Sequence, residues 1–259
     1  MHDKRTVTVF IIATNKYIDY AINLIKSINQ FFTGMDSVQI IVLTDSINDF
    51  TLPIFRDEFS LQAHQIPSYG WPEATLLRFE LMLKFWNFVT GNIVMYLDAD
   101  TEVVSCIEFN QLMSKCDYSL SSGVSLVLHP GYFNRKFVRR LLTRTTVGPW
   151  ESRKQSTAFV PFLKRNRYVC GGVFWGLKDS FNLLCGELKL QIDLDLKRNV
   201  IAKHNDESHL NRWFVSNSTQ ASTPEWAFAR GYHNLEGLTP RIEVIHKPLS
   251  FIRLPTVID

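Results

Sequence analysis

Two carboxylates close an apolar stretch of the sequence. Ile93-Val-Met-Tyr-Leu reads as a buried strand, and Asp98 and Asp100 follow at its carboxyl end. Side chains alternate faces along a strand, so both acids point to the same side if strand geometry continues through them. Such a pair suits a hard divalent cation, and the cation suits a diphosphate. Buried strands also end in ordinary acidic turns, so the pattern alone does not decide its role.

A second cluster lies late in the chain, where Asp206-Glu207-Ser-His-Leu-Asn211 gathers two acids, a hydroxyl, an imidazole and an amide. Acids favour the first turn of a helix, so a solvated helix N-terminus is one interpretation. The other interpretation is that a rigid helix holds Glu207 beside a reacting carbon.

The elements that must position these acids alternate between strand and helix. Apolar runs predict buried strands at 7–13, 38–44, 61–66 and 93–98. Helical spacing predicts one helix between Asn15 and Gly34 and another from Pro72 to about Phe88. The alternation predicts right-handed βαβ units, and ligands of open α/β sheets bind at the carboxyl ends of the strands.

The second half of the chain is less regular. Strands are predicted at 124–129 and 168–176, and helices from about Asp179 to Lys197 and from Asn205 onward. Paired glycines inside the strand at 168–176 predict a bulge or a close approach of backbone to ligand. A basic stretch at 134–154 without clean periodicity predicts a loop, or a helix with a loop.

Composition narrows the class of protein. The chain has 259 residues, 46% of them hydrophobic, and a formal net charge of +3, which is too small to indicate a nucleic-acid partner. Its four cysteines lack C-x-x-C spacing and are expected to be free thiols. We expect no transmembrane segment and no signal peptide, and therefore a soluble, cytoplasmic protein.

The ordered set of motifs resembles glycosyltransferase family 6, the retaining α-1,3-galactosyl- and N-acetylgalactosaminyltransferases that include the blood-group A and B enzymes. The matching pieces, in family order, are Ala13, Tyr17, Trp71, Arg78, Asp98-Ala-Asp100, His129-Pro-Gly131, Glu151, Arg153, Gln155-Ser156, Ala158, Tyr168 with the Gly-Gly pair, Asp206 to Asn211, Pro224-Glu225, Lys247 and Arg253. The resemblance implies an α/β protein of the GT-A type. Its nucleotide-binding, Rossmann-like half would be residues 1–105, merged with an acceptor-binding and catalytic half at 106–259.

The resemblance also implies roles for particular residues. Those expected to contact the nucleotide are Ile12, Ala13, Tyr17, Asp98, Lys247 and Arg253. For Ile12 and Ala13, simple core packing is the alternative. Asp98 and Asp100 would hold Mn²⁺, or Mg²⁺, through the diphosphate, and the metal would neutralise charge on the departing UDP. The C-terminal tail would close over bound UDP and exclude water.

The donor sugar is expected to contact Arg78, Asp206 and the tripeptide Cys170-Gly171-Gly172. The small residues of this tripeptide resemble the blood-group A pattern, which favours UDP-N-acetylgalactosamine over UDP-galactose. Glu207 would be the catalytic carboxylate, either as the nucleophile of a double displacement or as the stabiliser of a front-side attack.

The acceptor is expected to be a galactose-terminated glycan bound near His129, Trp150 and His204. His204-Asn205 stands where vertebrate members have Trp-His, and Ala229 stands where the blood-group enzymes have an acid, so the acceptor need not be a vertebrate glycan. The basic stretch could make weak peripheral contact with an anionic membrane. A divalent-metal nucleotidyltransferase or phosphodiesterase, and a lectin-like binder, are the alternatives from other classes.

Overall fold

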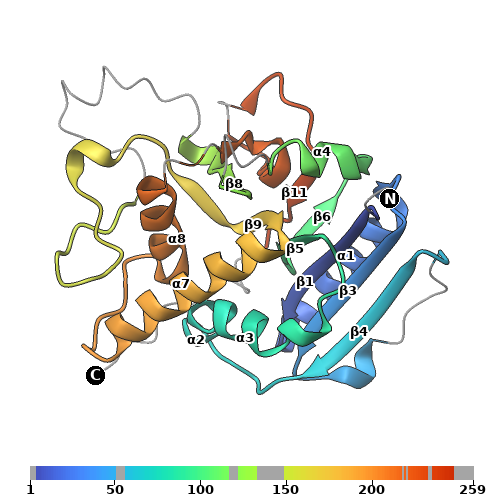
Figure 1. Ribbon diagram of the computed structural model, residues 1–259, viewed down its shortest axis with the longest axis horizontal. Coiled ribbons are helices and arrows are strands. Elements are labelled where there is room, and N and C mark those ends of the chain that lie inside the picture. Colours follow the sequence, from blue (N-terminus) through green and yellow to red (C-terminus); the bar gives the residue numbers. More distant parts are fainter. Residues whose placement is uncertain are drawn as a thin grey trace.

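A seven-stranded sheet runs through the molecule in the order β10-β8-β9-β5-β1-β3-β4 (Figure 1). The computed structural model describes residues 4–50, 56–116, 122–132, 149–217, 219, 221–232 and 235–247. The strands of the sheet are β1 (Thr6–Ala13), β3 (Ser37–Thr44), β4 (Phe59–Gln65), β5 (Ile93–Asp98), β8 (Val124–Leu128), β9 (Val169–Leu177) and β10 (Ala221–Ser222). Strands β1, β3, β4 and β5 are parallel, whereas β9 runs antiparallel to β5 and β8.

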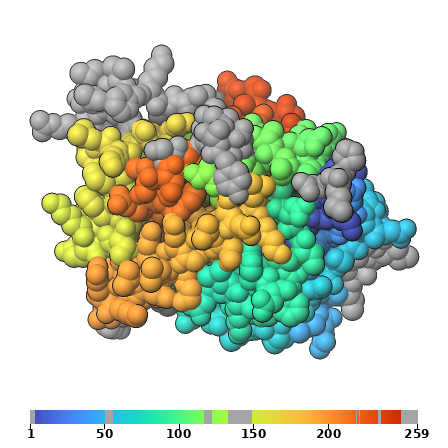
Figure 2. All heavy atoms as spheres, in the orientation of Figure 1, coloured from blue at the N-terminus to red at the C-terminus, as the bar shows by residue number. Residues whose placement is uncertain are grey.

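Helices cover both faces of this sheet. They are α1 (Ile18–Phe31), α2 (Glu73–Leu76), α3 (Arg78–Lys84), α4 (Phe109–Met113), α7 (Lys178–Leu196) and α8 (Asn205–Ser216). Two small ribbons complete the fold, β2 (Phe32–Thr33) with β7 (Ile107–Glu108) and β6 (Thr101–Val103) with β11 (Ile242–Val244). In the space-filling view, α3 and α7 lie side by side on the face toward the viewer (Figure 2).

The alternation of side chains along β1 explains why the core has two layers, one on each face of the sheet. Val9 and Ile11 pack with α1 on one face, whereas Phe10 packs with α3, α7 and α8 on the other, and all three side chains are fully buried. Strands buried on both faces read as continuous apolar runs, which is why the sequence located them. The mixed α/β fold with a mostly parallel sheet is confirmed. The sheet joins strands from both predicted halves, and the division near residue 105 stays a prediction.

Three expectations about elements were wrong. The predicted helix at 72–88 is broken into α2, α3 and a 3₁₀ turn at Trp86–Phe88. The first helix ends at Phe31 instead of Gly34, which has a φ of +65° after the short strand β2. The D-x-D does not continue the strand: β5 ends at Asp98, and residues 99 and 100 form a turn that the Thr101 hydroxyl closes by donating to the Asp98 carbonyl at 2.7 Å.

No helix in the described part of the chain is both long and apolar enough to cross a membrane. Most of the basic stretch at 134–154, and with it the expected membrane contact, lies outside the described residues. The four cysteines are free thiols, of which three are buried and Cys106 is exposed.

Two glycines should respond oppositely to replacement by alanine. A Cβ at Gly91 would overlap the backbone of Val7 and Thr8, so Gly91→Ala should cost about 2–3 kcal/mol. Gly186 lies inside α7 with open space around its Cα, so Gly186→Ala should stabilise by about 0.5–1 kcal/mol. Urea unfolding of both variants measures the difference, and a neutral Gly91→Ala would contradict the tight packing of this turn against β1.

Candidate active site

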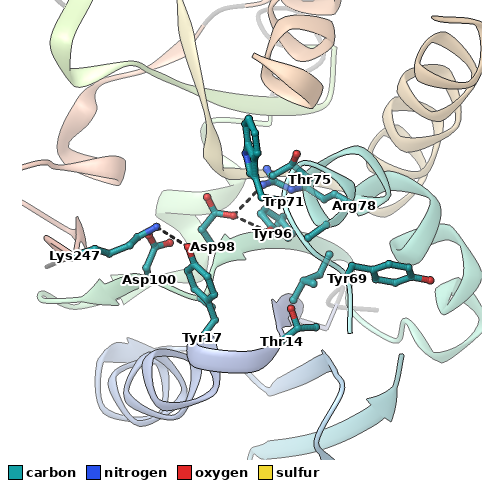
Figure 3. Close-up of a pocket in the computed structure, with 13 residues that line it drawn as sticks. Thr14, Tyr17, Tyr69, Trp71, Thr75, Arg78, Tyr96, Asp98, Asp100 and Lys247 are labelled. Atoms are coloured by element: carbon teal, nitrogen blue, oxygen red, sulfur yellow. Dashed lines mark hydrogen bonds and ion pairs between the residues drawn. The ribbon is translucent and has the colours of Figure 1, made fainter. Parts of the chain in front are cut away.

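Two cavities meet at the D-x-D. The larger has a volume of about 580 Å³ and the smaller about 250 Å³, and Asp98 and Asp100 line both. The larger is lined by Ile12, Thr14, Tyr17, Tyr69, Trp71, Ala74, Thr75, Arg78, Tyr96, Asp98, Ala99, Asp100 and Lys247 (Figure 3). The smaller is lined by Asp98, Asp100, Thr101, His129, Pro130, Cys170, Gly172, Val173, Glu207, Ala227, Ala229, Tyr232 and Val244. The two acids therefore stand at the junction of two binding spaces, reached through a turn rather than by strand alternation.

The guanidinium of Arg78 holds the acids of different elements together. Arg78 opens α3, is almost completely buried, and contacts Asp98 at 3.1 Å and Asp206 at 3.0 Å. It also donates to the carbonyl of Gly171 and stacks 4.5 Å from the ring centre of Tyr96. Burial opposes its charge, but the combined attraction of its acidic neighbours, of which Asp206 contributes most, outweighs that cost and the pKa of Arg78 is raised. An arginine is suited to this position because its guanidinium has several N–H donors and can hydrogen-bond several acceptors at once.

Asp98 is fixed by donors from two elements. The Tyr96 hydroxyl donates to its Oδ1 at 2.7 Å, on the same carboxylate oxygen that Arg78 contacts (Figure 3). Tyr96 and Asp98 share a face of β5 because they are two residues apart. On the other side of Asp98 lies Gly172, where a Cβ would come within 2.7 Å of Oδ2. The glycine thus leaves room for the carboxylate, in addition to any room it leaves for a ligand.

Glu207 occupies the first turn of α8 and lines the smaller cavity. Its Oε2 accepts the N–H of Gly171 at 2.9 Å. That N–H is available because residues 170–172 of β9 pair with neither neighbouring strand: the register with β8 skips from Phe174 to Val169, and pairing with β5 ends at Val173. The bulge that the paired glycines predicted is confirmed, and it supplies a donor for the acid.

Burial sets the protonation of both acids on α8. It raises the pKa of Glu207 to about 7, against the hydrogen bonds from Tyr168 and Gly171 that favour the charged form. It raises the pKa of Asp206 to about 6, against the attraction of Arg78. The hydroxyl of Tyr168 is itself buried and lacks a hydrogen-bond partner of good geometry, although its interaction with Glu207 lowers the pKa of that acid. A buried carboxyl group whose pKa lies near neutrality is typical of an active site.

Lys247 covers the other acid of the D-x-D. Its ammonium contacts Asp100 and donates to the Tyr17 hydroxyl at 3.1 Å, as the dashed lines in Figure 3 show. Burial and the neighbouring Asp98 raise the pKa of Asp100, which Lys247 partly reverses. A buried acid in this position requires a positive charge, and the C-terminal segment supplies one.

An aromatic cluster borders the smaller cavity. His129 packs against Tyr132 and Tyr168, with ring centres 4.7 and 5.9 Å apart, and Trp150 meets Tyr168 edge-on at 5.1 Å. Burial lowers the pKa of His129 to about 4, and its Nδ1 accepts the N–H of Gly131 at 3.1 Å. His129 is therefore neutral and faces the cavity.

The residues expected to bind ligands are not all equally close to the cavities. Ile12, Tyr17, Arg78, Asp98, Asp100 and Lys247 line the larger one, and His129, Cys170, Gly172 and Glu207 line the smaller one. Ala13 is fully buried in the core beside α1, because it faces the opposite side of β1 from Ile12. Asp206 is buried against Arg78, Trp150 is buried behind Tyr168, and His204 is exposed at the start of α8. Arg253 lies outside the described residues.

Sequence reasoning missed several residues that line the larger cavity. Tyr96 could have been found, because strand alternation puts it on the same face as Asp98. Thr14 follows the last residue of β1, where ligands of such sheets bind. Tyr69 belongs to a segment between β4 and α2 that has no periodic pattern.

The carboxylate pair can hold a divalent cation only with help from a ligand. No group of three or more His, Cys, Asp or Glu side chains suited to a metal occurs in the described part of the chain. Two carboxylates, one of them buried with a raised pKa, fit an oxygen-ligated ion whose remaining positions are filled by phosphate and water. This donor set matches a metal that binds together with a diphosphate.

A nucleotide-sized cavity joined to a smaller one, with acids at the junction and at the carboxyl ends of the strands, defines a transferase of the GT-A type. The model of glycosyltransferase family 6 matches residues 1–245, and the chain belongs to this family. It is a glycosyltransferase, which decides against the alternatives of a phosphodiesterase or a lectin. Members of the family generally depend on a divalent metal.

The individual relatives share only a minority of their residues with this chain. The chain is 29% identical over 212 residues to the O-antigen biosynthesis glycosyltransferase WbnI of Escherichia coli, covering 82% of each protein. It is 25% identical over 230 residues to globoside alpha-1,3-N-acetylgalactosaminyltransferase 1 of Gallus gallus and 24% identical over 233 residues to the Homo sapiens protein of that name. These matches cover 85% of this chain but only 61% and 60% of the two animal enzymes.

Glu207→Gln should stabilise the metal-free protein at about pH 8 far more than at about pH 5. The folded pKa of about 7 exceeds the ordinary value of 4.5, so the folded state binds more protons than the unfolded chain between these values. Stability therefore falls as pH rises through that window, by about 3 kcal/mol in total. The neutral amide of glutamine does not titrate in this range, so the variant avoids this loss of stability. Urea unfolding at both pH values with a chelator present measures it, and an equal effect at both would contradict the raised pKa.

Proposed function

We propose that this glycosyltransferase moves N-acetylgalactosamine, or galactose as the alternative, from a UDP donor to the 3-hydroxyl of a galactose-terminated glycan, with retention of the α configuration. The bond from the sugar's anomeric carbon to UDP breaks, a bond to the acceptor oxygen forms, and the proton of the acceptor hydroxyl passes to the departing diphosphate or to solvent. The observation that carries the proposal is the junction itself: Glu207 lines the smaller cavity, which shares Asp98 and Asp100 with the larger one.

The larger cavity suits the nucleotide. Ile12 and Tyr17 offer an apolar edge and an aromatic face for uracil and ribose, and both line it. Lys247 lines the same cavity and would turn from Asp100 to the diphosphate when the donor binds. Arg253 would complete that grip from the tail.

A divalent cation, Mn²⁺ or Mg²⁺, would be held by Asp100 with Asp98 beside it. When bound, it would neutralise the charge that builds on the departing diphosphate. Asp98 has one oxygen committed to Arg78 and Tyr96, which leaves Oδ2 for a sugar hydroxyl or the metal.

Glu207 would act on the sugar. Its carboxylate is fixed by the Gly171 N–H and borders the cavity where the donor sugar and acceptor meet. It can attack the anomeric carbon, or it can stabilise the positive charge that develops there during a front-side attack. Both routes require the ionised form of Glu207, and with a pKa of about 7 a substantial fraction of this acid is ionised at neutral pH.

The choice between the two donors falls on the tripeptide Cys170-Gly171-Gly172. Cys170 and Gly172 line the smaller cavity, where small residues leave space for an N-acetyl group. The animal relatives are named as N-acetylgalactosaminyltransferases, which supports this donor. His129 and the exposed His204 would contact the acceptor, and the buried Trp150 would support this site only from behind Tyr168. The name of the bacterial relative suggests an O-antigen glycan as the acceptor.

Loss of the Glu207 carboxylate should abolish transfer but not donor binding. Glu207→Gln should lower kcat by about 10³-fold or more, because the amide can neither attack nor carry compensating charge. Glu80→Gln is the matched control, since Glu80 is a half-exposed acid of α3 that pairs with Lys189 and lines neither cavity. UDP release from UDP-sugars with a galactosyl acceptor measures both. Full activity of Glu207→Gln would contradict the proposed function.

Chelation should stop the enzyme, and the same assay can identify the donor. We expect UDP-N-acetylgalactosamine to be the preferred donor in a screen of UDP-sugars, with activity lost in EDTA and restored by Mn²⁺. Asp100→Asn should raise the Mn²⁺ concentration needed for half-maximal activity by about tenfold or more, because a charged ligand is lost. Asp193→Asn, which removes a surface acid of α7, should not. Activity that persists unchanged in EDTA would contradict the metal requirement.

A further inference from the structure

The side chain of Asn211 forms three hydrogen bonds, two that join α8 to β9 and one within α8. It is 1% exposed and lies one helical turn after Glu207. Its Oδ1 accepts the N–H of Val169, and its Nδ2 donates to the carbonyls of Val169 and Glu207, each at 2.8 Å. One amide side chain therefore binds both backbone groups of a single strand residue and the backbone of the residue that carries the acid.

The surroundings of the Glu207 carboxylate depend on where the backbone of Val169 lies. Tyr168 precedes it and Gly171 follows two positions later, and both interact with the Glu207 carboxylate. The intervening sheet gives little support, because residues 170–172 pair with neither β5 nor β8. Among the described residues, the backbone around the Gly171 N–H is fixed by the contact of Arg78 with the Gly171 carbonyl and by the chain on either side. Val173 pairs with β5 on one side, and on the other Val169 pairs with β8 and hydrogen-bonds Asn211 through both of its backbone groups.

We propose that Asn211 is a positioning residue for catalysis: it clamps the start of β9 to α8 so that the Gly171 N–H and the Tyr168 side chain meet Glu207. This inference rests on the proposed role of Glu207. Only an amide fits the position, because it must accept one bond and donate two within the reach of a short side chain. An aspartate keeps the acceptor but turns both donations into repulsive contacts with carbonyl oxygens.

The same helix contains a matched control. Asn217 follows α8 and its Nδ2 donates to the carbonyl of Trp213, four residues back, at 3.0 Å. This bond is of the same kind as the bond from Asn211 to Glu207, but neither Asn217 nor Trp213 lines the larger or the smaller cavity. Asn217→Asp therefore reproduces the loss of an asparagine bond in α8 without touching β9.

Asn211→Asp should lower kcat by about tenfold or more while the donor KM and the UDP dissociation constant change by less than about twofold. The split is expected because neither Val169 nor Glu207 lines the larger cavity. Asn217→Asp should leave kcat, KM and UDP affinity unchanged. Steady-state kinetics and calorimetric titration of UDP, both with Mn²⁺, measure these quantities, and thermal melting confirms that each variant is folded.

Asn211→Ser is the second variant if Asn211→Asp does not fold. A serine can bond back to the carbonyl of Glu207 but cannot reach both groups of Val169, so it removes the clamp and keeps the helix bond. We expect the same selective loss of kcat. Wild-type kcat in a folded Asn211 variant, or a parallel loss of UDP affinity, would overturn the positioning role. If Glu207→Gln is inactive and these variants are normal, only this inference fails; if Glu207→Gln is active, the proposed function fails.

Discussion

The site depends on one buried guanidinium. Arg78 is the charge that lets the carboxylates of Asp98, from β5, and Asp206, from α8, approach each other, although Asp206 is buried and Asp98 lines both cavities. Without it, Asp206 would carry the full cost of burial and the two acids would repel each other. The hydrogen bond from Arg78 to the Gly171 carbonyl brings the third element, β9, to the same point. Three segments far apart in the sequence are thus fixed around one side chain.

The two cations of the site, Arg78 and Lys247, neutralise different acids. Asp98 and Asp206 have a partner in Arg78, whereas the buried Asp100 is neutralised by Lys247 from the C-terminal segment. A metal and a diphosphate could replace the contact between Lys247 and Asp100 without disturbing the group around Arg78. Glu207 has no cation in direct contact among the described residues, and burial therefore raises its pKa to about 7. The acid that would face developing positive charge on a sugar is thus the one left uncompensated in the free protein.

The sequence predicted the parts of this arrangement that follow from local pattern. Continuous apolar runs located β1, β3 and β5, and helical spacing located α1, because burial imposes those periods directly. The helix at 72–88 was not resolved into α2 and α3, since propensity does not reveal where tertiary contacts break a helix. The turn after Asp98 was also missed, although the two acids still reach the same cavities. Pairings such as Asn211 with Val169, 42 residues apart, have no signal in a single sequence.

The two glycines of β9 show how binding and architecture constrain the same positions. The resemblance to the blood-group A pattern interprets Gly171 and Gly172 as space for the donor's N-acetyl group. The structure gives each glycine a second reason: a Cβ at 172 would press on Asp98, and a Cβ at 171 would lie 3.4 Å from both Arg78 and Glu207. A larger residue at 172 would therefore move the carboxylate that binds Arg78 before it narrowed the cavity. If the tripeptide contacts the donor sugar as proposed, a change in sugar specificity at position 172 would require the Asp98 side chain to adjust as well.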